Sequence, residues 1–124
     1  IEIIDALAFH EMGPEAAAKR VYERTNVTNV YLTFDIDCLD PAYAPGTGTP
    51  VVGGLSSAQA LLTLRHLKNL QVVGSDVVEV SPAYAHADIT SNAGATVAMY
   101  MLGTLWVRRR PSLSPPPAQL ESPK

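Results

Sequence analysis

The stretch VYLTFDID, residues 30–37, decides the fold class of this sequence. Val30–Phe34 is a short run of β-forming residues bounded by turn-forming ones, which predicts a buried strand. A second apolar run, Leu70–Val80, predicts another strand. Helical patterns precede, separate and follow these two runs, so strands and helices alternate along the chain.

Three segments carry helix signals. Gly13-Pro14-Glu15 is a helix start, because proline is favoured at the first helical position and an acid suits the positive end of the helix dipole. Ser56 or Ser57 can cap a leucine-rich helix that ends near Asn69. The remaining expected elements are a last helix over Thr90–Val107 and the end of a strand at Ile1–Ile4.

This alternation predicts an α/β fold with a mostly parallel sheet and helices on both of its faces. Two strands and a possible third make a sheet narrower than the usual four to six strands. A parallel sheet also needs cover on both faces. We therefore expect the chain to form part of a larger domain.

The overall composition excludes several classes of protein. The 124 residues are 47% hydrophobic and carry 9 basic against 12 acidic side chains, so no basic excess is present for nucleic-acid binding. The single cysteine, Cys38, excludes an internal disulfide framework and fits a reducing compartment, so we expect a cytoplasmic location. The sequence begins at Ile1 and shows no targeting segment.

Two further segments bear on the domain organisation. Ile89–Val107 is uncharged, but its polar and small residues favour a buried helix over a membrane span. Pro111–Lys124 contains five of the ten prolines and no aromatic residue, which predicts a disordered tail. We therefore divide the chain into a globular part, residues 1–107, and a proline-rich tail, residues 108–124.

Two carboxylates, Asp35 and Asp37, directly follow the first strand. If the strand continued through them, they would point to the same side. Two converging carboxylates repel each other unless a cation lies between them, and hard divalent cations prefer oxygen ligands. The pattern thus predicts a metal site; the alternative is that one aspartate caps a turn while the other faces solvent.

Glu79 is expected at the same edge of the sheet as these aspartates. Ligands of parallel α/β sheets bind beyond the carboxyl ends of the strands, and both strands would end there. The long glycine- and proline-rich loop Asp40–Gly54 leaves from that edge too. We expect this edge to bind a cationic or metal-bound ligand.

Other chemically active side chains have structural interpretations. Asp76 would face the other side of its strand and accept a hydrogen bond. Cys38 has no nearby base and is expected to be a packed small residue. His66 is expected in solvent, and His10 and His86 lack the paired spacing of metal ligands.

The motifs FDIDCLDPAYAPGTGTPVVGGL (Phe34–Leu55) and DVVEVSPAY (Asp76–Tyr84) resemble the two signatures of the ureohydrolase (arginase/agmatinase) family. The spelling of the first motif is most similar to the agmatinase branch. The resemblance extends over about residues 1–107 and implies the C-terminal part of a three-layer α/β/α fold, here of a homo-oligomeric enzyme.

The resemblance also implies roles for individual residues. Family members use two Mn²⁺ ions to hydrolyse a guanidinium group and release urea. Asp35 matches the aspartate that bridges both ions, and Asp37 matches a ligand of the second ion. Glu79 matches the acid that holds the guanidinium group, and Thr49 matches a threonine beside the substrate.

The sequence departs from the family pattern in several places. It lacks the earlier histidine and DAHxD-type metal ligands as well as the catalytic histidine, so the catalytic residues are unknown. His10, in AFHEMG, matches none of them, and Ala85 replaces an aspartate that is common in the second signature. The metal site is therefore expected to be incomplete in this chain alone.

Three functions remain open at this point. The first is an agmatinase-like hydrolysis of agmatine to putrescine and urea. The second is a non-catalytic remnant that assembles with a complete chain. The third is a phosphatase of the haloacid dehalogenase type with Asp35 as nucleophile and Asp37 as acid/base, in which the APGTGTP loop and Glu79 would have no role.

Overall fold

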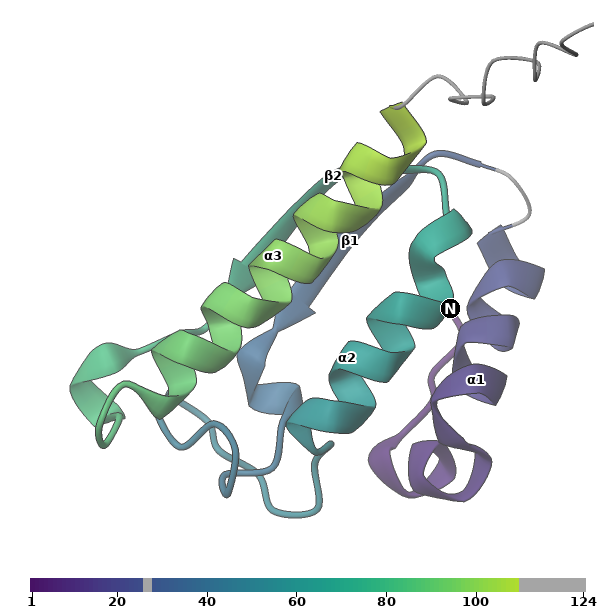
Figure 1. Ribbon diagram of the computed structural model, residues 1–124. Coiled ribbons are helices and arrows are strands. Elements are labelled where there is room, and N and C mark those ends of the chain that lie inside the picture. The colour runs from purple at the N-terminus through teal and green to yellow at the C-terminus, as the bar shows by residue number, and fades with distance from the viewer. Residues whose placement is uncertain (26–27, 110–124) are drawn as a thin grey trace, which may run out of the picture.

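The computed structural model describes residues 1–25 and 28–109, with only the backbone for 104–109. This part of the chain contains three α-helices, two strands and three short 3-10 turns (Figure 1). In chain order these elements are α1 (Ala6–Thr25), β1 (Val30–Asp35), η1 (Ile36–Cys38), α2 (Ser57–His66), η2 (Leu67–Asn69), β2 (Val72–Val78), η3 (Pro82–Tyr84) and α3 (Ile89–Arg109).

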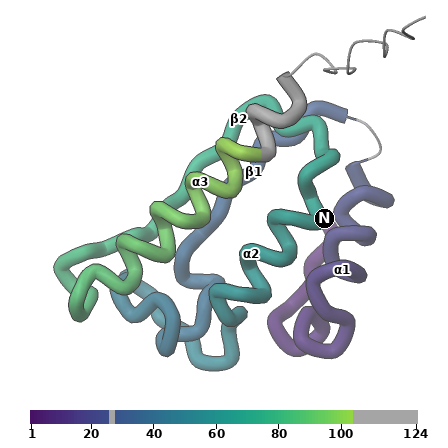
Figure 2. Tube along the Cα trace, in the orientation of Figure 1, coloured from purple at the N-terminus to yellow at the C-terminus, as the bar shows by residue number. Residues whose placement is uncertain are grey.

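The two strands form a parallel pair, which confirms the predicted α/β class with a parallel sheet. Thr33 lies opposite Asp76 and Asp35 lies opposite Val78. The chain crosses from β1 to β2 through α2, so the carboxyl ends of both strands lie at one edge. The Cα trace shows the loop after β1 and the connection after β2 at this same end of the molecule (Figure 2).

One apolar cluster lies between the sheet and two helices. Figure 1 shows α3 lying along the strands with α2 beside it. The cluster consists of Leu64, Val97 and Met101 from the helices, packed against Leu32, Phe34 and Val77 from the strands and Leu61. A second cluster, around Ala18, Leu67 and Leu70, attaches α1 to the C-terminal end of α2. The three helices therefore lie on one side of the sheet (Figure 1), and no helix of the described residues covers its other face.

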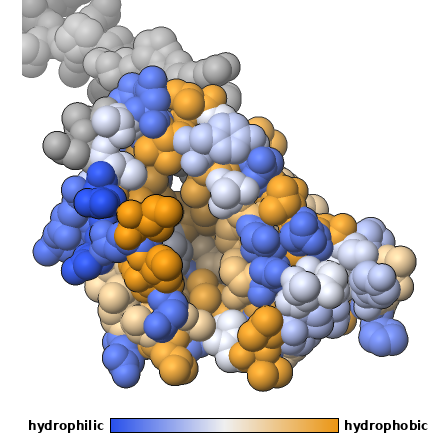
Figure 3. All heavy atoms as spheres, turned by 180° about the vertical axis from the view of Figure 1, so that it is seen from behind, coloured by the Kyte–Doolittle hydropathy of each residue, from blue (hydrophilic) through white to orange (hydrophobic). Residues whose placement is uncertain are grey.

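That opposite face, called here the open face, carries exposed side chains. Tyr31 is 62% exposed, and its ring lies close to Gly74, where a Cβ would come within 2.9 Å of it. The Tyr31 hydroxyl donates a hydrogen bond of 3.0 Å to Asp76 Oδ2, so Asp76 is an acceptor, as predicted. Seen from behind, the molecule is hollowed along its middle, and apolar side chains lie at several places on this surface (Figure 3).

The boundaries of the helices correct part of the sequence-based interpretation. Residues 1–4 form no strand, because Asp5 starts a helix there by accepting a hydrogen bond of 2.9 Å from the Ala8 amide. Gly13, with φ 79°, interrupts α1, and the segment predicted from Pro14 follows it. Ser56 caps α2 in a reciprocal arrangement with Gln59, which confirms one of the two predicted caps.

The C-terminal elements differ less from prediction. β2 is shorter than Leu70–Val80, because Leu70 closes η2 by donating to the Leu67 carbonyl and Glu79 leaves the extended conformation with a φ of 63°. Helix α3 begins one residue before Thr90 and continues beyond Val107 to Arg109. No helix among the described residues is long and apolar enough to cross a membrane. Residues 108 and 109 of the predicted tail belong to α3, and the rest of it, residues 110–124, lies outside the described residues.

Candidate metal and ligand site

The candidate site begins where β1 ends. Asp35 is the last residue of the strand and caps η1, because its Oδ1 accepts a hydrogen bond of 3.1 Å from the Asp37 amide. Asp37 therefore does not continue the strand, and Asp35 makes the turn cap that the alternative interpretation gave to one of the two aspartates. The chain turns here because Ile36 is fully buried with Leu39 and Ala44, which takes Asp37 out of the strand. The turn keeps both carboxylates at the carboxyl end of β1.

Glu79 follows β2 directly and lies in a strained conformation. Its φ of 63° is in the left-handed region, which side chains other than glycine enter at a cost. Strained residues of this kind cluster at functional sites. The carboxylate Oε2 lies 4.0 Å from the position that a Cβ on Gly48 would occupy, so Glu79 faces the GTGT segment of the loop.

The 40–54 loop is fastened at its base by Asp40. The carboxylate of Asp40 accepts hydrogen bonds from the amides of Ala42 (2.9 Å) and Gly53 (2.8 Å), which lower its pKa. Gly54 passes so close to the start of the loop that a Cβ there would lie 2.7 Å from the Cys38 carbonyl oxygen. These contacts bring the two ends of the loop together.

Hydrogen bonds also join the same loop to the connection that follows β2 and to the start of α3. The Gly46 amide donates to Thr90 Oγ1 (2.7 Å), and the Gly46 carbonyl accepts from the Ser81 amide (2.8 Å). A Cβ on Gly46 would lie 2.5 Å from the Cβ of Ala85, so glycine is required here. Thr49 lies between the two fastenings, and its hydroxyl donates a hydrogen bond of 2.7 Å to Asp37 Oδ2.

The acidic groups influence one another at this edge. Burial raises the pKa of the Asp35 carboxyl above its usual value, and the charges of Asp37 and Glu79 add to the rise, against the lowering effect of the Asp37 amide. Burial, followed by the charges of Asp35 and Asp37, raises the pKa of the Cys38 thiol to about 11. A thiol with this pKa is protonated at neutral pH and is not a nucleophile, in agreement with its predicted packing role.

The donor set has the chemistry of a hard-cation site but not a complete one. Asp35 and Asp37 supply carboxylate oxygens, the ligands that Mn²⁺ and Mg²⁺ prefer. Within the described residues, no three His, Cys, Asp or Glu side chains lie close enough together to hold a metal ion. The chain thus fits such an ion with two ligands, and further ligands would have to come from elsewhere.

None of the three histidines is hydrogen-bonded to Asp35, Asp37 or Glu79 in the described part of the chain. His10 is a contact that the sequence did not predict: its Nε2 lies 3.1 Å from the Gly53 carbonyl oxygen, and its Nδ1 lies 3.3 Å from Gln59 Nε2. It therefore links α1 to the base of the loop and to the cap of α2. His66 and His86 are exposed.

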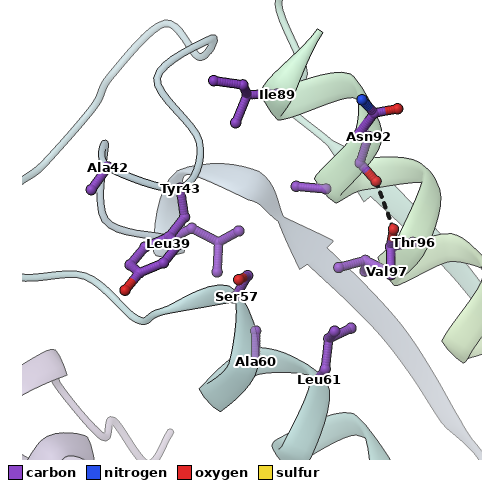
Figure 4. Close-up of a pocket in the computed structure, with 11 residues that line it drawn as sticks. Leu39, Ala42, Tyr43, Ser57, Ala60, Leu61, Ile89, Asn92, Thr96 and Val97 are labelled. Atoms are coloured by element: carbon purple, nitrogen blue, oxygen red, sulfur yellow. Dashed lines mark hydrogen bonds between the residues drawn. The ribbon is translucent and has the colours of Figure 1, made fainter.

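A cavity of about 350 Å³ lies beside the loop, between α2 and α3 (Figure 4). Tyr43 and Ile89 stand at opposite sides of it, and Leu39, Ala60 and Val97 are among its apolar lining residues. None of the acidic side chains lines this cavity. It is therefore separate from the candidate site.

The fold and the site together define an α/β protein with an acidic site beyond the carboxyl ends of two parallel strands. Comparison with protein families matches residues 1–103 to the arginase family. The chain belongs to this family, as the two signature motifs indicated.

Individual relatives agree with this assignment. An agmatinase from Proteus mirabilis is 55% identical over 100 residues, which are 81% of this chain and 33% of the relative. A hypothetical agmatinase from Burkholderia thailandensis superposes with a TM-score of 0.85 at 52% identity and covers 87% of this chain and 34% of its own. The proclavaminate amidino hydrolase from Streptomyces clavuligerus gives a TM-score of 0.82 at 41% identity, over 84% and 36% of the two chains. The chain thus spans about a third of the length of the proteins it matches.

Proposed function

We propose that this chain is the part of an agmatinase-like ureohydrolase that supplies Asp35 and Asp37 to a binuclear Mn²⁺ site and Glu79 and Thr49 to a guanidinium substrate. The observation that carries the proposal is the meeting of these four residues at one strand edge, where Thr49 contacts Asp37 and Glu79 faces the adjoining residue Gly48. The two agmatinases that resemble the chain support agmatine as the substrate.

The groups at this edge are suited to a cation rich in N–H donors. A carboxylate such as that of Glu79 accepts charge-assisted hydrogen bonds from a guanidinium group. The Thr49 hydroxyl gives its one proton to Asp37, so it offers only lone pairs to a neighbouring ligand. Two Mn²⁺ ions, when bound, supply an acidified water as the nucleophile. Asp35 and Asp37 are the residues of this chain that hold them.

The isolated chain is expected to be inactive. It offers two carboxylate ligands, and the described residues contain no third ligand close to them. Urea release from agmatine by the purified chain with Mn²⁺ should therefore equal that of buffer. Robust turnover would contradict the proposal that this chain supplies only part of the active site.

Metal binding tests the proposal directly. The chain should bind Mn²⁺ weakly, and the double substitution Asp35→Asn plus Asp37→Asn should abolish the binding in a calorimetric titration. The control is Glu11→Gln plus Glu15→Gln, which removes the same charge from exposed acids of α1. Tight binding that survives the aspartate substitutions would move the metal site elsewhere.

A second candidate function is a non-catalytic piece that acts by assembling with a complete homologous chain in the cytoplasm. The open face of the sheet favours it, because parallel sheets are normally covered on both faces. As part of this second proposal, the complete enzyme itself forms homo-oligomers. Co-purification with a tagged agmatinase, lost in variants of the open face, would distinguish this function from the first.

A further inference from the structure

We propose that Thr49 is a positioning residue that holds the carboxylate of Asp37 in place for the metal, an inference that rests on the metal site of the proposed function. The Thr49 hydroxyl lies 2.7 Å from Asp37 Oδ2. An ionised carboxylate can only accept, so the hydroxyl is the donor. This role differs from that of a threonine that contacts the substrate alone.

The chain orients each carboxylate through one of its oxygens. Asp35 Oδ1 accepts from the Asp37 amide, and Asp37 Oδ2 accepts from Thr49. Apart from these two bonds, the described residues 1–25 and 28–109 offer the two carboxylates no N–H or hydroxyl donor, and the Asp35 and Asp37 carboxyl groups lie within hydrogen-bonding reach of each other. A side chain held in this way loses less conformational freedom when it binds a metal ion.

The backbone around Thr49 is itself held from both sides. Gly46 is bonded to Ser81 and Thr90 on one side, and Gly53 is bonded to Asp40 on the other. Pro50 follows directly and restricts the conformation of the Thr49 backbone. The hydroxyl therefore acts from a loop that is fastened at both ends.

Thr47, two residues earlier, offers a contrast within the same loop. Its side chain is only 3% exposed, and its hydroxyl has no hydrogen-bond partner among the described residues. Thr47→Val therefore removes a hydroxyl of the same type from the same loop without touching a carboxylate. It is the matched control for Thr49→Val.

The first experiment measures Mn²⁺ affinity from the electron paramagnetic resonance signal of the free ion, which counts unbound metal whatever the association state of the chain. Hydrogen bonds from residues behind a metal ligand are typically worth roughly 10–100-fold in affinity. Thr49 is exposed, so we expect a loss of roughly 3–10-fold in Thr49→Val. Thr49→Ser, which restores the hydroxyl, and Thr47→Val should bind like the original chain. Equal affinity of Thr49→Val and the original chain would overturn the inference.

The second experiment needs no metal, so it separates this inference from the proposed function. Hydrogen exchange followed by mass spectrometry reports the amides of Asp37, Asp40 and Leu55, which are bonded at the base of the loop. Thr49→Val should speed their exchange, whereas Thr49→Ser and Thr47→Val should not. A chain that binds no Mn²⁺ but shows this pattern would refute the metal site and support the positioning contact. Unchanged exchange in Thr49→Val would refute the contact.

Discussion

The two faces of the β1–β2 sheet differ in what covers them. On the covered face, Leu32 and Phe34 pack against α2 and α3 and leave little apolar surface to solvent. On the open face, Tyr31 is 62% exposed and Val78 is 36% exposed. The small number of strands predicts that Leu32, Phe34, Val72, Val77 and Val78 are exposed. This is wrong except for Val78: the other four are half-buried, Val72 against residues of α1 and η2 and the rest against α2 and α3.

The difference shows that the described helices cover one face of the sheet and that the other face lacks a covering layer. Folded domains retain only about 5–15 kcal/mol of stability, and each buried side chain of this size contributes about 1.5–3 kcal/mol. Burying the exposed residues of the open face would thus add a large fraction of the free energy of unfolding of a typical domain. The chain also spans about a third of the length of its relatives.

The largest expected effect concerns association. The isolated chain should be molten, aggregated or oligomeric, because parallel edges and uncovered apolar faces recruit other chains. Light scattering should therefore give a mass above the 13.2 kDa of one chain. Together, a monomeric mass, a cooperative thermal transition and dispersed amide NMR signals would contradict this.

A charged pair on the open face sharpens the same test. Thr33→Lys plus Val78→Lys should lower the associated fraction, since lysines on an uncovered sheet oppose pairing. The control is Val51→Lys plus Val52→Lys, which adds the same charge to exposed residues of the 40–54 loop. Equal effects of the two variants would show that net charge, and not the open face, controls association.

On the covered face, the next largest effect is expected for Leu64. It is 5% exposed in the cluster of α2, α3 and the strands, so Leu64→Ala should cost the oligomeric form of the chain about 2–5 kcal/mol in urea unfolding. Leu62, on the same helix, is 45% exposed, and Leu62→Ala should cost less than about 1 kcal/mol. Similar costs at both positions would mean that α2 does not pack on the sheet in this way.

A smaller effect is expected at the edge where both faces end. Glu79 is in the left-handed region, so Glu79→Ala keeps the backbone strain and Glu79→Gly removes it. The glycine variant should be about 1 kcal/mol more stable than the alanine variant in urea unfolding. The opposite order would show that φ at this position is negative in solution.

The smallest effect is a pH dependence at Asp35. Its pKa is raised in the folded chain, chiefly by burial, so folding disfavours the charged form. The resulting penalty is absent below the usual value of 3.8 and grows as the pH rises through the higher folded value. Asp35→Asn should therefore raise the melting temperature slightly at neutral pH and have no such effect at about pH 3. A gain that is equal at both pH values would contradict this assignment.

The regular elements were predictable where local signals were strong. The β-forming run at Val30–Phe34 became β1, and Ser56 capped α2 through the Gln59 three residues later. The first turns of α1 were missed because Gly13 and Pro14 indicate a helix start, although Asp5 is a cap signal that could have revealed the earlier one.

The side-chain contacts of the site were less predictable. The bond from Tyr31 to Asp76 joins residues 45 positions apart and depends on the register of the strands. The bond from Thr49 to Asp37 depends on where a loop closes, which no local pattern specifies. The direction of Asp37 depends on a 3-10 turn that the burial of Ile36 imposes after β1.

The closed base of the 40–54 loop has a consequence for how the chain can vary. The Asp40 amide donates to the Leu55 carbonyl and the Leu55 amide donates to the Cys38 carbonyl, so the loop leaves and re-enters the scaffold at one point. The entropy of closing such a loop changes slowly with its length. Residues can therefore be inserted at exposed positions such as Val51 and Val52, outside the contacts of Gly46 and Thr49, while β1 and α2 keep their places. This part of the loop can thus differ in length between related chains on an unchanged framework.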